Sequence, residues 1–169
     1  MKRRLYNAKI FLVLCLCLLL QARSEGQSLM GKVAASAKVS SLSLGEGIAQ
    51  QNPLLLELVT RAGLMPVLSN GEAYTFFAPA ESTLAQHQQD SPEQLKAFLE
   101  QHIVKGSLTT QDLRDGADLT SLRGSSLRIC RKKGDILVSG VRLTQPDQLF
   151  SNGVWHQMNG AFQPSKTSF

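Results

Sequence analysis

Histidine and cysteine are the residue types in this sequence with the clearest capacity for chemistry. His102 falls on the apolar face of a predicted helix, and His156 shares a face of a predicted strand with Val154 and Met158. A metal site needs ligands close together, such as two histidines on one helix face. The spacing of His87, His102 and His156 offers no such pair. We therefore predict no metal or cofactor site, and we interpret His102 and His156 as hydrogen-bonded structural imidazoles.

Cys130 lies between Ile129 and Arg131 in the middle of a predicted strand. A cysteine becomes a nucleophile when a base such as histidine reaches it, whereas a small buried thiol is the more common outcome. The sequence contains no glycine-rich phosphate loop, no Ser–His–Asp order and no paired-carboxylate motif. We predict no catalytic residue. The open alternative is a hydrolase acting on polysaccharide or peptide, which needs two convergent carboxylates or a nucleophile with its base.

A basic cluster, defined as Arg128, Arg131, Lys132 and Lys133, stands out in the second half of the chain. Such a cluster can dock an anionic glycan, a lipid head group or nucleic acid. We favour a solvated hairpin turn, because Asp135 follows directly and no aromatic residue is interleaved. The cluster stays a candidate for ligand contact.

Three aromatic residues are candidates for a binding surface, because aromatic side chains are enriched at interfaces. Phe76 and Phe77 are adjacent in a predicted strand, so their side chains point to opposite faces. Trp155 is the aromatic side chain that we expect to be partly exposed, because tryptophan is seldom fully buried. The possible ligand contacts are therefore Trp155 and the basic cluster.

The N-terminus has the pattern of a secretory signal peptide. Lys2, Arg3 and Arg4 precede an unbroken apolar run at residues 10–20, and the small residues Ala22 and Ser24 follow. The run is shorter than the roughly 20 residues that a membrane-spanning helix requires. We predict that residues 1–24 are removed, that no transmembrane segment is left, and that the protein is secreted, extracellular or periplasmic.

The predicted signal peptide carries most of the excess positive charge. Five of the 18 Lys and Arg residues lie in residues 1–24, which leaves 13 basic residues against 13 acidic ones. The balance gives no support for a nucleic-acid partner, because nucleic-acid binders carry a basic face in the folded domain. Cys130 is then the remaining cysteine, so no internal disulfide is expected.

The remaining chain divides into a lead-in and one domain. Residues 25–47 are rich in Ser, Ala and Gly, and we interpret them as a linker or loosely packed lead-in. Residues 48–169 form the predicted domain. Asn52-Pro53 predicts one helix start, and Ser91-Pro92 with a capping box predicts another. From residue 119 to residue 158 the apolar pattern has period two. Helices followed by antiparallel strands predict an α+β domain.

Four segments together are similar to a known family. Residues 75–79 (TFFAP), 102–106 (HIVKG), 119–124 (LTSLRG) and 151–156 (SNGVWH), with the later Pro164, occur in the order and spacing of a fasciclin domain. The resemblance extends over nearly all of the chain that follows the predicted signal peptide. We assign structural signature roles to the following residues: Thr75, Phe76, Pro79, His102, Gly106, Asn152, Gly153 and His156.

The resemblance implies a compact β-sandwich or wedge flanked by a layer of helices. It also implies an exported adhesion module whose partner is an extracellular, matrix or cell-surface protein or glycan. A single compact domain of this kind suggests a bacterial exported protein. A small envelope or matrix structural protein without a specific ligand stays open beside the adhesion and hydrolase hypotheses.

Overall fold

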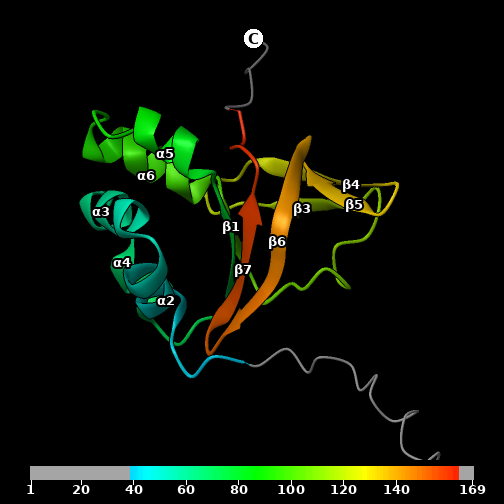
Figure 1. Ribbon diagram of the computed structural model, residues 1–169, viewed down its shortest axis with the longest axis horizontal. Helices are drawn as coiled ribbons and strands as arrows, with labels where there is room; N and C mark the ends of the chain where they lie inside the picture. Colours follow the sequence, from blue (N-terminus) through cyan, green and yellow to red (C-terminus); the bar gives the residue numbers. More distant parts are fainter. Residues whose placement is uncertain (1–38, 164–169) are drawn as a thin grey trace, which may run out of the picture. The chain divides into compact units, whose positions relative to one another are not determined.

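The computed structural model describes residues 39–163, which all fall within one compact unit (Figure 1). The predicted signal peptide at residues 1–24 and the first part of the predicted lead-in lie outside these residues. Within residues 39–163, no helix is long and apolar enough to cross a bilayer.

Within residues 39–163, five helices form one layer. They are α2 (Leu44–Gln51), α3 (Pro53–Arg61), α4 (Met65–Ser69), α5 (Glu81–Gln86) and α6 (Pro92–Glu100). The two predicted helix starts are present. Asn52 Oδ1 accepts the Leu55 N–H at 2.9 Å at the start of α3, and Ser91 forms a capping box with Gln94 at the start of α6. Each cap satisfies backbone donors that a helix start leaves unpaired.

The structure corrects the predicted start of the domain. Residues 40–47 are not a linker, because α2 begins within them with a capping box of Ser43 and Glu46. Leu44 and Ile48 are fully buried in the core. The Ser40 N–H also donates to the Leu149 carbonyl at 3.0 Å. Burying these side chains ties the lead-in to the sheet, at about 1.5–3 kcal/mol for each fully buried Leu or Ile.

Seven strands of the described part of the chain form one sheet in the order β2-β1-β7-β6-β5-β4-β3. They are β1 (Tyr74–Ala78), β2 (Ile103–Lys105), β3 (Asp118–Thr120), β4 (Ser126–Lys132), β5 (Asp135–Val138), β6 (Val141–Phe150) and β7 (Gly153–Met158). The predicted α+β class is confirmed. The sheet is not wholly antiparallel, however, because β1 pairs with β7 in parallel. These two strands are joined by a long connection, as parallel pairing requires.

The two edges of the sheet meet. Val104 in β2 forms a bridge with Ser121 after β3, and the Leu122 N–H donates to the Ile103 carbonyl at 2.7 Å. The sheet therefore curls into a wedge, with the helices on the β1–β7 side and β3–β5 on the other (Figure 1). Closure covers strand edges that would otherwise offer unpaired backbone groups.

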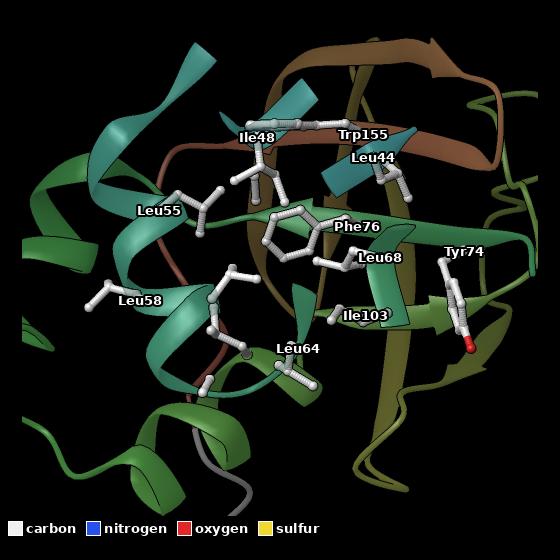
Figure 2. Packing of buried hydrophobic residues seen from close by; sticks show 14 of the residues in the cluster. Leu44, Ile48, Leu55, Leu58, Leu64, Leu68, Tyr74, Phe76, Ile103 and Trp155 are labelled. Carbon is white, nitrogen blue, oxygen red and sulfur yellow. The ribbon is translucent and has the colours of Figure 1, made fainter. Parts of the chain in front are cut away.

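Two hydrophobic clusters lie on opposite sides of β1. Phe76 packs in the helix-side cluster, and Phe77 packs inside the wedge, which confirms that their side chains point to opposite faces. Figure 2 shows Phe76 beside Trp155, with Leu44, Ile48 and other helix residues closing over both rings. The ring centroids of Phe76 and Trp155 are 5.9 Å apart, in an edge-on arrangement.

The burial of Trp155 corrects the expectation that it is partly exposed. The residue is 2% exposed, because α2 and the other helices cover the face of β7 on which it lies. The indole contributes core packing, together with Phe76 and Phe150. It is not available as a ligand contact in this fold.

Candidate functional site

Two buried side chains from the predicted signature segments hold the same loop. Thr75 Oγ1 donates to the Gly106 carbonyl at 2.6 Å and accepts the Leu108 N–H at 2.8 Å. His156 lies on the neighbouring strand β7. Its Nδ1 accepts the Asp147 N–H at 3.1 Å, so Nε2 carries the proton and donates to the Leu108 carbonyl at 2.8 Å. The segment that follows β2 is thus fixed to β1 and β7 together.

The electrostatics of His156 keep its imidazole neutral. Burial lowers the pKa of His156, against smaller opposing effects of the Leu108 carbonyl and the Asp147 carboxylate. The ring also stacks on Phe77, with centroids 5.3 Å apart. Because backbone groups occupy both ring nitrogens, neither is free to take a proton from a substrate.

His102 has the same character at the end of α6. Its Nε2 accepts the Phe162 N–H at 2.9 Å, so Nδ1 carries the proton and donates to the Phe98 carbonyl at 2.8 Å. Burial lowers the pKa of His102 to about 4, outweighing the effect of the Phe98 carbonyl. The ring is stacked on that of Phe162, with centroids 4.5 Å apart. His102 therefore joins α6 to the C-terminal segment.

Asn152 connects β7 to two helices. Its Oδ1 accepts the Leu44 N–H at 2.7 Å, at the start of α2. Its Nδ2 donates to the carbonyls of Leu68 and Asn70, both at 2.9 Å, at the end of α4. A single amide thus satisfies one donor and two acceptors of the backbone, which is how a buried amide is normally accommodated.

Three further signature residues, Gly153, Gly106 and Pro79, are explained by their backbone geometry and packing. A Cβ added to Gly153 would lie 1.9 Å from the Tyr74 carbonyl oxygen, so the parallel strand β1 leaves no room for one. Gly106 has φ +96°, a conformation that favours glycine. Pro79 is buried, and its carbonyl accepts Nε2 of Gln157 at 3.0 Å.

The buried polar groups of the described residues are all accounted for. Among residues 39–163, no buried side-chain nitrogen or oxygen lacks a hydrogen-bond partner. The polar signature residues therefore use their hydrogen bonds to hold loops and helices to the sheet. They do not converge on a common point where a substrate could react.

The structure divides the basic cluster between two roles. Arg128 pairs with Asp118 at 2.5 Å on the exposed face of the sheet. Arg131 donates to two backbone carbonyls of the loop before β3. Lys132 and Lys133 are exposed at the β4–β5 turn. Two of the four side chains are therefore engaged within the molecule, which leaves a smaller basic surface than the sequence indicated.

Cys130 is exposed, which corrects the expectation of a buried thiol. The alternation of β4 places Leu127 and Ile129 in the wedge and Cys130 on the outside with Arg128. The alternation of Leu127 and Ile129 with Arg128 already places Cys130 on the same face as Arg128, and the expectation of a buried thiol overlooked this pattern.

A pocket of about 390 Å³ lies beside α5 and α6, and we call it the α5–α6 pocket. His87 and Asp90 line it, with His87 Nδ1 2.6 Å from Asp90 Oδ2. His87 stacks on Phe98, with ring centroids 3.9 Å apart. This pair was not among the residues predicted from the sequence. In the sequence, the pair could be recognised as a histidine three residues before an aspartate that directly precedes the helix cap Ser91.

The pocket geometry bears on the hydrolase alternative. The α5–α6 pocket contains a single carboxylate, that of Asp90. A more open pocket beside Arg131 also contains a single carboxylate, that of Asp115. Neither pocket has the two facing carboxylates that glycoside hydrolysis needs.

Comparison with known proteins agrees with this architecture. The sequence model of the fasciclin domain matches residues 51–164. A solved structure of a FAS1 domain pair from the insect cell adhesion molecule fasciclin I is similar, with a TM-score of 0.60 and 17% sequence identity. The alignment covers 75% of this chain and 52% of the insect chain, so this protein spans about half the length of that pair.

Proposed function

This chain belongs to the fasciclin domain family, and from that membership we propose that it is an exported, non-catalytic module that binds an extracellular, matrix or cell-surface ligand in adhesion. The family match over residues 51–164 is the observation that carries the proposal. The signal-peptide pattern of residues 1–24 supports export.

The hydrogen bonds of the buried polar residues support the role of a rigid binding scaffold. Thr75, Asn152 and His156 fix loops and helix ends to the sheet through short hydrogen bonds. Recognition by loops on a rigid scaffold needs this kind of support, because a loop that is already ordered loses less entropy when a ligand binds.

The composition of the surface favours a polar ligand. Within residues 39–163, Val39 is the one large hydrophobic residue with an exposed side chain. Large exposed apolar patches mark surfaces that bind other proteins through hydrophobic contact. The ligand is therefore expected to be held mainly through polar contacts.

The test is binding of the full chain, expressed with its own N-terminus so that processing can occur. Matrix proteins, neutral glycans and acidic glycans are presented at two salt concentrations. We expect saturable binding to one class. No binding to any class by a folded protein would contradict the proposal and favour a structural protein without a ligand.

The hydrolase alternative is tested in the same preparation. Polysaccharide and peptide substrates are assayed for release of product, with His87→Ala as the matched variant. His87 is chosen because its Nε2 has no hydrogen-bond partner within the described residues, whereas both nitrogens of His102 and His156 are occupied. Turnover that His87→Ala abolishes would establish an enzyme.

A further inference from the structure

Side-chain amides dominate the polar lining of the α5–α6 pocket. Gln86 ends α5, Gln94 lies in the first turn of α6, and Gln101 caps the end of α6. Each amide carries two N–H donors and one carbonyl acceptor, and each hydroxyl group is both a donor and an acceptor. Several amides around one pocket therefore match a ligand that is rich in hydroxyl groups.

Two of these amides are held in place by the backbone. Gln94 Oε1 accepts the Ser91 N–H at 2.9 Å, and Gln101 Nε2 donates to the Gln163 carbonyl at 2.8 Å. Within the described residues, Nε2 of Gln94 and Oε1 of Gln101 have no hydrogen-bond partner. Each side chain thus offers one fixed polar group to a ligand, and such preorganisation reduces the entropy lost on binding.

A series of stacked rings forms the apolar part of the wall. His87 stacks on Phe98, and Phe98 leans against the buried His102 with centroids 4.7 Å apart. His87 is the outer member, with its side chain 28% exposed, and the Asp90 carboxylate fixes its Nδ1 at 2.6 Å. The wall therefore combines flat rings with a few placed polar groups, as small-molecule sites do.

The charges around the pocket disfavour an anionic ligand. The carboxylate of Asp90 and the guanidinium of Arg123 balance each other in the lining. Residues 39–101, which supply the helices, contain seven acidic and two basic residues. A net negative helix segment of this kind disfavours a polyanion. Within residues 39–163, no group of three His, Cys, Asp or Glu side chains could hold a metal ion.

We propose that the α5–α6 pocket binds the terminal sugar of a neutral glycan. The amides of Gln86, Gln94 and Gln101 and the carboxylate of Asp90 bond the hydroxyl groups, and the ring of His87 supports the sugar's C–H face. The pocket, at about 390 Å³, is small among ligand sites of roughly 300–1,000 Å³, so it suits the end of a glycan. The inference rests on the proposed function and names its ligand class and site.

The test uses Gln94→Glu in the full chain. Glutamate keeps the oxygen that caps α6, so the fold is retained, but it removes the amide donors and adds a charge beside Asp90. Gln50→Glu is the matched control, because it makes the same change on the exposed end of α2. Gln86→Ala removes a second pocket amide independently of the α6 cap.

The readout is the dissociation constant for neutral oligosaccharides found by array screening, measured at low and high salt. We expect Gln94→Glu to weaken binding about tenfold or more, as the loss of a directed hydrogen bond does. Gln86→Ala should also weaken it, whereas Gln50→Glu should not. Binding should change little with salt, because the ligand is uncharged.

The two proposals fail in different ways. If the chain binds a protein or an acidic glycan, and both pocket variants bind it like wild type, the pocket proposal is overturned and the adhesion module stands. If the folded chain binds no ligand of any class, both proposals are overturned. Neutral-glycan binding that both pocket variants leave unchanged would also overturn the pocket assignment.

Discussion

Replacing Asn152 with aspartate should destabilise the fold with almost no change in side-chain volume. Asn152 Nδ2 donates to the carbonyls of Leu68 and Asn70, both at 2.9 Å, and Oδ1 accepts the Leu44 N–H. Aspartate keeps the acceptor but turns a second oxygen toward the two carbonyls. Each buried group left without a partner costs about 1–3 kcal/mol, so we expect the free energy of unfolding to fall by about 2–6 kcal/mol at pH 7.

The loss of stability in Asn152→Asp should become smaller as the pH is lowered. Burial and the two facing carbonyls disfavour the charged carboxylate, so the pKa of the introduced group lies above its unfolded value of about 3.9. Between these two values the folded variant binds more protons than the unfolded one. Its stability relative to wild type therefore rises as the pH falls, because the protonated carboxyl can donate to one carbonyl.

Urea unfolding at pH 7 and pH 5 measures both effects. Asn159→Asp is the control, because Asn159 is exposed and uses its Oδ1 to accept the Arg142 N–H at 3.0 Å, a role that aspartate preserves. The control should stay within about 0.5 kcal/mol of wild type. An Asn152→Asp protein as stable as this control would refute the assignment of Asn152 as the link between β7 and the helices.

Three further predictions concern the strand pair, a buried histidine and the thiol. Gly153→Ala should lower the free energy of unfolding by more than about 3 kcal/mol in thermal melts, since its Cβ would lie 1.9 Å from the Tyr74 oxygen; Gly71→Ala, with no atom within 4 Å of the added carbon, should be tolerated. Because burial lowers the pKa of His102 to about 4, the neutral imidazole contributes on the order of 3 kcal/mol to the free energy of unfolding above pH 6.5. This stability is lost as the pH falls from 6.5 toward 4, where the unfolded chain takes up the proton first. In NMR, ring signals of His102 that titrate near pH 6.5 would contradict this. Cys130 should react with a maleimide in the native protein as fast as in the unfolded chain, and protection from the reagent would show that the thiol is covered.

The helix starts and strand faces could be predicted because their causes are local. Asn52 and Ser91 accept N–H groups three residues along the chain, and adjacent residues in a strand such as Phe76 and Phe77 must face opposite ways. The candidate pocket could not be predicted. It draws on α5, α6, Arg123 and the segment near Gln163, and no local pattern relates these distant residues.

By itself, the sequence determined the family, the α+β class and the positions of the capped helices, because ordered motifs and backbone hydrogen bonds act over a few residues. The tertiary structure alone decided that β1 and β7 are parallel, that α2 belongs to the core and that Trp155 is buried. Burial depends on which element packs over a given face, and that is set by contacts between segments far apart in the chain.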